Sequence, residues 1–359
     1  MYNKYKKVIS NSKNTTNMDT NNMTTNTNNV NVKTETEISK CALTNTNTNI
    51  TTTNENNEIM FNKFKDLVKD EFKQFKDFLL NKDKIENPEN IPIEQTLTDW
   101  NICGESVVGL AHRRRNEICQ DAIYYANNTR PILVLSDGAG SGLVSELGSK
   151  ILTIGMCRFF NSLNEEFQLF LDNYKLLNDE EAIKEKCDYW SLIALNHAKG
   201  LLEDTAILNK RNIKDLRGTL LFVIVGKYFT FHFQLGDGAI IYQNKNEELK
   251  VILPNENSKG EFANQTIFVD EATINDIQSG VLLSNEINAI ALMSDGITCK
   301  LVSTDGSKVA GRINTWFDLL ANDNLTRDQL TSMFYSQEMS EKTNYDDRSI
   351  ILATIKKAN

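Results

Sequence analysis

The chain has 359 residues, a formal net charge of −9 at pH 7, 40% hydrophobic residues and 24% charged residues. These proportions are ordinary for a globular protein, and they exclude a collagen-like chain and a chain that is disordered throughout. The acidic balance argues against a nucleic-acid partner, which usually requires a basic face. No apolar run reaches about 18 residues, so we expect neither a transmembrane helix nor a membrane partner.

The first ten residues are polar and rich in lysine, with no apolar run behind them. They predict the absence of a secretory signal, and hence a cytoplasmic protein. Six cysteines are scattered without a C-x-x-C pair, and three histidines lie far apart in the sequence. We therefore expect reduced, mostly structural cysteines and no zinc site built from histidine and cysteine.

The N-terminal part differs in composition from the rest of the chain. Half of residues 1–60 are Asn or Thr, 16 and 14 respectively. This composition predicts that residues 1–57 form a disordered tail. The tail is either a tether for a partner or an extension without a specific function. In residues 58–82 phenylalanines recur at helical spacing opposite charged residues, so we expect an amphipathic helix. Two prolines in residues 83–96 indicate a linker.

Residues 97–359 read as one mixed globular domain. Strands and helices come in separate blocks, which favours an α+β layered fold. The expected strands are 105–110, 122–125, 132–135, 219–225, 228–235, 239–242, 290–293 and 349–355. The spacing across 219–242 predicts an antiparallel meander. The expected helical zones are 144–161, 165–208 and 328–337.

Two of these strands end in the same tripeptide, Ser-Asp-Gly. One is Ser136-Asp137-Gly138, and the other is Ser294-Asp295-Gly296. The glycines after Asp137 let the backbone turn sharply and let a carbonyl approach a ligand closely. A phosphate-binding loop is a rival interpretation, but Leu143 stands where the dinucleotide pattern requires glycine, and the Gly-Lys ending of Walker A is missing.

Further aspartates lie at strand ends. Gln120-Asp121 enters a strand, Asp346-Asp347 precedes the last strand, and Gly236-Asp237-Gly238 occupies a turn. Adjacent carboxylates repel one another unless a cation compensates their charge. Oxygen ligands of this kind suit Mg²⁺ or Mn²⁺ better than zinc, and two such ions serve phosphate-ester hydrolysis. Each Asp-Gly pair taken alone is more often a turn than a ligand.

The order of these motifs, over about 255 residues from Asn101 to Lys356, resembles the protein phosphatase 2C family of metal-dependent serine/threonine phosphatases. The matching pieces are Gln120-Asp121, Asp137-Gly138-Ala139-Gly140, Gly218-Thr219, Gly236-Asp237, Ser294-Asp295-Gly296 and Asp346-Asp347. The pattern around Gly109, His112 and Cys119, with Asn264-Gln265-Thr266, is similar to a divergent bacterial-type branch. The resemblance implies a four-layer α-β-β-α sandwich of two antiparallel sheets flanked by helices.

The resemblance also implies the roles of particular residues. Asp137 would bridge two Mn²⁺ or Mg²⁺ ions, the Gly138 carbonyl would bind the second ion, and Asp295 and Asp346 would hold the first. Asp121 would contact the ions or orient their waters, and Asp237 matches a position that can hold a third ion. Asp346 is preferred to Asp347, with a shift by one residue left open.

The sequence departs from the family pattern at two places. Ala139 stands where a histidine is suspected of protonating the leaving oxygen, and Gln120 replaces a glutamate. A general acid contributes roughly 10²–10⁴-fold, so its loss slows catalysis without abolishing it. His112 is a candidate replacement for the donor or a phosphate contact. The family's phosphate-binding arginine is expected among Arg113, Arg114 and Arg115, and we select Arg115.

The predicted function is hydrolysis of phosphoserine and phosphothreonine in proteins, with a phosphorylated protein as the substrate and a cognate kinase as an expected partner. The alternative is a pseudophosphatase that binds a phosphoprotein without turnover. The retained aspartates favour the enzyme, whereas Ala139 favours the alternative. The sequence names neither the substrate protein nor the oligomeric state.

Overall fold

The computed structural model describes residues 96–252, 266–303, 305–341 and 345–357. The predicted tail (1–57) and amphipathic helix (58–82) lie outside the described residues, as does the predicted linker (83–96) up to residue 95. None of the helices that the structure describes is long and apolar enough to cross a membrane.

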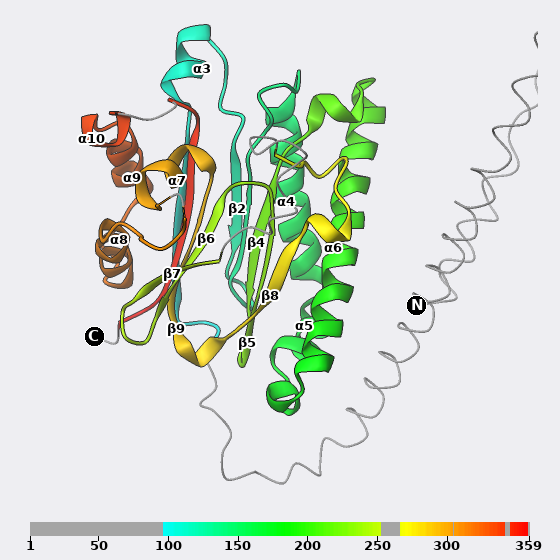
Figure 1. Cartoon of the computed structure of the whole chain (residues 1–359), viewed down its shortest axis with the longest axis vertical. Helices are drawn as coiled ribbons and strands as arrows, with labels where there is room; N and C mark the ends of the chain where they lie inside the picture. The colour runs from blue at the N-terminus through cyan, green and yellow to red at the C-terminus, as the bar shows by residue number, and fades with distance from the viewer. Residues whose placement is uncertain (1–95, 253–265, 304, 342–344, 358–359) are drawn as a thin grey trace, which may run out of the picture. The chain divides into compact units, whose positions relative to one another are not determined.

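Two five-stranded antiparallel sheets form the centre of the described domain (Figure 1). In strand order, the first sheet consists of β1 (Trp100–Val107), β10 (Arg348–Ile355), β9 (Ile287–Met293), β6 (Ala239–Asn244) and β7 (Leu249–Ile252). The second consists of β2 (Ala122–Ala126), β3 (Ile132–Ser136), β4 (Leu220–Val225), β5 (Phe229–Leu235) and β8 (Gln278–Leu283).

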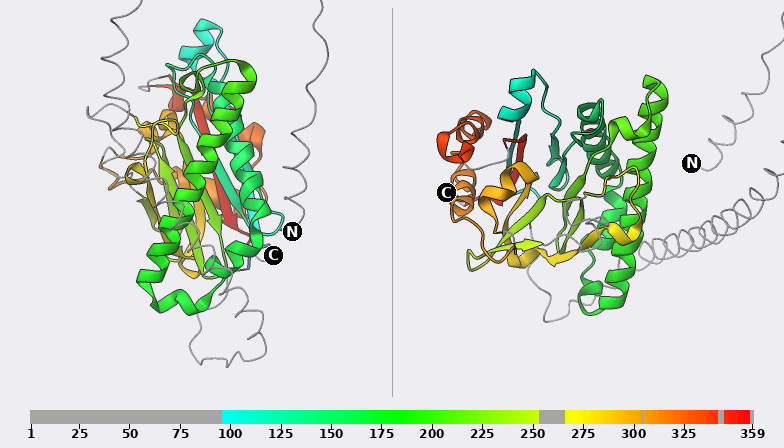
Figure 2. Two further views of the ribbon diagram at one scale, coloured as in Figure 1. Left: turned by 90° about the vertical axis from the view of Figure 1, so that its right-hand side faces the viewer. Right: turned by 45° about the horizontal axis from the view of Figure 1, so that its top comes forward.

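Helices cover the outer face of each sheet. The second sheet packs against α4 (Ser145–Ser162), α5 (Asn164–Leu171) and α6 (Glu180–Asn209), and the left view of Figure 2 looks onto these helices. The first sheet packs against α7 (Asp295–Leu301), α8 (Arg312–Ala321) and α9 (Arg327–Phe334), followed by α10 (Gln337–Ser340). This arrangement confirms the predicted α-β-β-α sandwich.

Three apolar layers hold the sandwich together. Ile132 and Val134 of β3 face the helices, whereas Leu133 and Leu135 of the same strand face the other sheet. Side chains of successive strand residues point to opposite faces. A strand covered on both faces therefore reads as a continuous apolar run, as β3 and β4 do in the sequence.

The predicted meander over 219–242 is wrong in its second half. β4 and β5 pair antiparallel, but β6 pairs with β7 and β9 in the opposite sheet. The chain crosses between the sheets at Gly236, whose φ of 108° lies in a region that favours glycine. Sequence spacing cannot distinguish this crossing from a hairpin, because β5 and most of β6 are buried on both faces.

Element ends also differ from the prediction. β1 begins at Trp100 and ends at Val107, and Leu110 belongs to the short helix α3 (Leu110–Arg115) instead of the strand. The predicted helical zone 165–208 divides into α5 and α6, joined by a 3-10 turn, Tyr174–Asn178. The short helices α7 and α8 were not predicted. In α7 the apolar residues are too few to establish a helical period. In α8, Ile313, Trp316, Phe317 and Leu320 do stand at helical spacing, and the prediction missed them.

Candidate active site

The first Ser-Asp-Gly segment is fixed by Thr219 at the end of β3. The backbone N–H of Asp137 donates to the Thr219 hydroxyl at 2.9 Å, and the N–H of Thr219 donates to the Asp137 carbonyl at 2.8 Å. The Ser136 hydroxyl donates to the Thr219 carbonyl at 2.6 Å. These contacts set the backbone of Asp137, so its partly buried carboxylate lines a cleft at this end of the sandwich.

The loop after Asp137 packs tightly against two neighbouring segments. Gly138 forms a β-bridge with Gly218, and the Ala139 N–H donates to the Arg217 carbonyl at 3.0 Å. A Cβ atom on Gly138 would lie 2.6 Å from the Gln120 carbonyl oxygen. Glycine is therefore required here by close backbone approach, and not by an unusual φ.

The second Ser-Asp-Gly segment lies where β9 leads into α7. Ser294 is the N-cap residue, and Asp295 is the first residue of the helix and lines the same cleft. A Cβ atom on Gly296 would clash with the Asp347 carbonyl oxygen. The turn at Gly296 thereby brings the start of α7 next to the residues that precede β10.

Asp346 and Asp347 are neighbours in sequence but lie in opposite environments. The Asp347 side chain is 2% exposed and accepts hydrogen bonds from the N–H groups of Gly109 at 2.7 Å and Gln120 at 2.6 Å. The Asp346 side chain is 44% exposed and lines the cleft. Asp347 therefore ties three chain segments together, while Asp346 is the more open of the two to a ligand.

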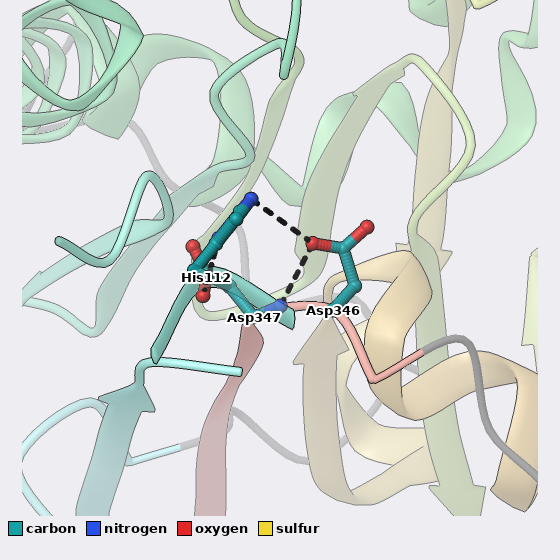
Figure 3. Close-up of side chains that lie close together, drawn as sticks. All are labelled: His112, Asp346 and Asp347. Carbon is teal, nitrogen blue, oxygen red and sulfur yellow. Dashed lines mark hydrogen bonds and ion pairs between the residues drawn. The ribbon is translucent and has the colours of Figure 1, made fainter. Parts of the chain in front are cut away.

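His112 lies between these two carboxylates (Figure 3). It is buried on α3, with Nδ1 2.9 Å from Asp347 Oδ1 and Nε2 3.9 Å from Asp346 Oδ1. Possible ligand atoms of His112, Asp346 and Asp347 all lie within 4.8 Å of one another. The structure thus brings His112 to the cleft, although nine residues separate it from Ala122, the first residue of β2.

Asp121 is buried among the other acidic groups. Burial first, and then the charge of Asp347, raise the pKa of Asp121 to about 7, against hydrogen bonds from Ser294 and Ser349 that lower it. Its Oδ2 atom has no hydrogen-bond partner among the described residues. A buried carboxylate oxygen without a donor is costly, so it is a position where a cation or an ordered water would be stabilising.

The cleft has a volume of about 170 Å³ and is acidic. Burial, followed by the charges of Asp121, Asp295 and Asp237, raises the pKa of Asp137 well above its ordinary value. Burial, followed by Asp237 and Asp346, raises the pKa of Asp295 to about 6. No lysine or arginine is among the described residues that line the cleft. These carboxylates repel one another without a protein cation, which is the environment that fits divalent cations.

The remaining wall of the cleft comes from a distant part of the chain. Asp237, in the turn after Gly236, accepts a hydrogen bond from the Thr266 hydroxyl at 2.6 Å. Phe268 lines the same wall, and the Arg217 guanidinium lies 5.3 Å from the centre of its ring. Thr266 and Phe268 were not predicted as site residues, although Thr266 belongs to the Asn264-Gln265-Thr266 segment that was matched to the bacterial-type branch.

The three consecutive arginines lie outside the cleft lining. Arg115 donates to Glu117 at 2.9 Å, the Arg113 guanidinium lies 4.4 Å from the centre of the Tyr335 ring, and that of Arg114 lies 5.7 Å from the Tyr345 ring. The assignment of Arg115 to phosphate binding stays a prediction, as do the metal and catalytic roles of the aspartates and of His112.

The molecule has a second hollow of about 420 Å³, lined by residues of β1 and β2 and by the loop after β2, among them Trp100, Tyr124 and Asn127. It lacks a carboxylate among its lining residues. Size alone would therefore select the wrong place, whereas the density of aspartates selects the cleft at the ends of β3 and β9.

We compared the chain with a family profile and with curated protein sequences. The sequence profile of the protein phosphatase 2C family matches residues 108–334. No curated protein sequence matches the chain.

Solved structures with a similar fold include a bacterial serine phosphatase, at 18% identity and a TM-score of 0.46, covering 72% of this chain and 98% of that one. Stp1, a serine/threonine phosphatase from Staphylococcus aureus, has 18% identity and a TM-score of 0.47, covering 76% and 100%. The catalytic domain of the serine/threonine phosphatase PstP, in complex with two manganese ions, has 14% identity and a TM-score of 0.45, covering 72% and 99%.

The profile spans more than half of the chain and includes the first Ser-Asp-Gly segment, the Gly-Asp-Gly turn and the second Ser-Asp-Gly segment. Because the profile matches more than half of the chain, including three of the segments that build the acidic cleft, the chain belongs to the protein phosphatase 2C family and is a protein phosphatase.

Proposed function

We propose that this protein hydrolyses phosphoserine and phosphothreonine monoesters in proteins with the help of two divalent cations, Mn²⁺ or Mg²⁺. One observation carries the proposal. The carboxylates of Asp137, Asp237, Asp295 and Asp346 line one small cleft, and the described lining contains no lysine or arginine. Such a set of oxygen ligands suits hard cations.

The family resemblance distributes the ligands among the ions. Asp137 would contact both ions, the Gly138 carbonyl the second, and Asp295 and Asp346 the first. Asp121 would contact the ions or orient their waters, and Asp237 would hold a third ion. The cations would stabilise charge on the phosphoryl oxygens and increase the acidity of an attacking water.

The chain's own residues position these groups and the leaving oxygen. Thr219 fixes the backbone of Asp137 through two hydrogen bonds, so its carboxylate projects from a rigid strand end. His112 lines the cleft and is the candidate hydrogen-bond donor to the leaving oxygen. Its Nδ1 lies against Asp347, while its Nε2 lies 3.7 Å from a Glu117 oxygen and 3.9 Å from an Asp346 oxygen. Ala139 also lines the cleft but has no proton to donate.

A pseudophosphatase is not favoured, since the candidate acidic ligands are retained and Asp137, Asp295 and Asp346 line one cleft. The bacterial-type branch, the cognate kinase, the cytoplasmic location and the absence of nucleic-acid and membrane partners stay predictions from the sequence.

The test is metal-dependent hydrolysis of an aryl phosphate. We expect activity with added Mn²⁺ or Mg²⁺, loss of activity with EDTA, and recovery when metal is restored. Calorimetric titration of the metal-free protein with Mn²⁺ provides a second measurement that does not depend on turnover. Equal activity with and without chelator, together with no heat of Mn²⁺ binding, would refute the two-cation proposal.

A further inference from the structure

A basic edge borders the acidic cleft. The helix α3 carries three consecutive exposed arginines, 113–115, and stands beyond the ends of the strands (Figures 1 and 2). It is anchored to the segment that carries Asp346, because the Ala111 N–H donates to the Tyr345 carbonyl at 2.9 Å. The contact between His112 and Asp347 adds a second anchor. The arginines of α3 are therefore held at a fixed place beside the cleft.

The three arginines differ in how their charge is compensated. Arg115 forms an ion pair with Glu117, with an N–O distance of 2.7 Å. Arg113 lies over the Tyr335 ring at 4.4 Å. Arg114 lies over the Tyr345 ring at 5.7 Å, and among the residues that the structure describes no carboxylate lies within ion-pair distance of it. Among the described residues Arg113 likewise forms no ion pair, but only Arg114 lies over the ring of Tyr345, which directly precedes the cleft residue Asp346. We therefore take Arg114 as the cation on this edge that meets an incoming anion beside the cleft.

Large apolar side chains lie on the same edge. Ile118, which follows α3, is 59% exposed, and Tyr345, which precedes the cleft residue Asp346, is 36% exposed. An exposed aromatic ring beneath a guanidinium holds it by a cation–π contact while leaving its N–H groups free to bind. The chain as a whole carries a net charge of −9, whereas the three arginines make this edge locally positive.

We propose that this edge, formed by Arg114, Tyr345 and Ile118, selects phosphoprotein substrates that carry an acidic residue close to the phosphorylated residue. This inference rests on the proposed function and names its substrate class. The acidic side chain binds the Arg114 guanidinium, which suits a carboxylate because it offers two parallel N–H donors. The neighbouring peptide packs on Tyr345 and Ile118. A second phosphorylated residue at the same position provides a larger negative charge, about −1.5 to −2.

The experiment compares two phosphothreonine peptides that differ only in having Glu or Gln beside the phosphorylated residue. The full-length protein is assayed with Mn²⁺, and kcat/KM is measured for both peptides. We expect the wild-type protein to prefer the Glu peptide about tenfold, as is typical of a charge-assisted hydrogen bond. The ratio should fall to about one in Arg114→Gln and below one in Arg114→Glu. The preference should also shrink as the salt concentration rises.

The control variant is Arg158→Gln. Arg158 is an exposed arginine on α4, thirteen residues along the helix from Ser145, or about 20 Å at 1.5 Å per residue. It should retain the wild-type ratio. A wild-type protein without preference for the Glu peptide, or an Arg114→Gln variant that keeps the preference, would overturn the inference.

A result that refutes the catalytic proposal can be distinguished from one that refutes the recognition edge. A wild-type protein that hydrolyses neither the aryl phosphate nor the peptides would refute the catalytic proposal. The edge is then tested by fluorescence anisotropy with the same two peptides. Tighter binding of the Glu peptide, lost in Arg114→Gln, would support the edge as a recognition surface of a binding protein. Equal affinities would refute it.

Discussion

The two Ser-Asp-Gly segments share a sequence but differ in local structure. After Ser136-Asp137-Gly138 the chain enters a loop that is fastened to Thr219 and Arg217. After Ser294-Asp295-Gly296 it enters the helix α7 directly, with Ser294 as N-cap. The residue that follows each glycine also differs, since Ala139 lines the cleft whereas Ile297 is buried in the apolar layer beneath α7 and α8.

This difference shows that the tripeptide specifies where an aspartate is placed, and not how the chain continues. Each aspartate comes at the end of an interior strand, one in each sheet, and both strands end at the same cleft. The two sheets therefore bring Asp137 and Asp295 to one cleft, although 157 intervening residues separate them in sequence.

The largest expected effect distinguishes the two aspartates themselves. Asp137→Asn should lower metal-dependent kcat by about a thousandfold, because it removes a negative charge from the position predicted to contact both cations. Asp295→Asn should cost about a hundredfold, since it is predicted to contact one cation. Steady-state assays over a Mn²⁺ titration give both values. Melting temperatures serve as the control and should not fall, because Asp137 is predicted to serve the metals and not the core. Near-normal turnover of Asp137→Asn would show that the two-cation assignment is wrong.

The next effect concerns the segment that packs against the second tripeptide. Asp347→Asn should lower the free energy of unfolding by about 2–3 kcal/mol, because the buried carboxylate that accepts hydrogen bonds from two backbone N–H groups is lost. Asp346→Asn should cost less than about 1 kcal/mol, since its side chain is partly exposed. Urea unfolding of the metal-free proteins measures both. Equal destabilisation by the two substitutions would contradict the division between a structural and a cleft-lining carboxylate.

The two glycines provide a smaller and more local comparison. Gly296→Ala should destabilise the protein by about 1–3 kcal/mol, because the added methyl group meets the Asp347 backbone. Gly138→Ala should cost less, since its obstacle at 2.6 Å requires a smaller shift. Gly200→Ala is the matched control. It lies within α6 with nothing within 4 Å of the added atom, so it should stabilise the helix by about 0.5–1 kcal/mol. The order of the three unfolding midpoints tests the packing, and a midpoint of Gly296→Ala above that of Gly138→Ala would contradict it.

Much of the site could be predicted because its parts are short and lie at strand ends. Asp137 and Asp295 were selected because each follows an apolar run, and Asp346 because a pair of carboxylates precedes the last strand and the family resemblance favours the first of them. All three line the cleft. The burial of Asp347 could not be predicted, because it depends on N–H groups of Gly109 and Gln120 that are more than 220 residues away. The crossing of β6 into the other sheet was missed for a similar reason, since burial on both faces removes the alternation that would reveal it.

The smallest expected effect concerns the residue after the first glycine. Ala139→His should accelerate hydrolysis of a serine phosphopeptide by up to about tenfold and leave an aryl phosphate almost unchanged. A general acid helps in proportion to how poorly the leaving oxygen departs without a proton, and an aryl oxide departs readily. Ala139 is buried at the cleft wall, so the imidazole must displace solvent from the cleft to reach the leaving oxygen.

His112 determines how this result is interpreted. Ala139→His, His112→Ala and the double variant are each assayed on both substrates. If His112→Ala slows only the phosphopeptide and Ala139→His restores the rate, the donor lies on α3 in this protein instead of in the glycine loop. A His112→Ala protein with normal rates on both substrates would leave water as the donor, and His112 would then serve to connect α3 to Asp347. A loss of rate on both substrates that accompanies a lower melting temperature would assign His112 to that connection as well.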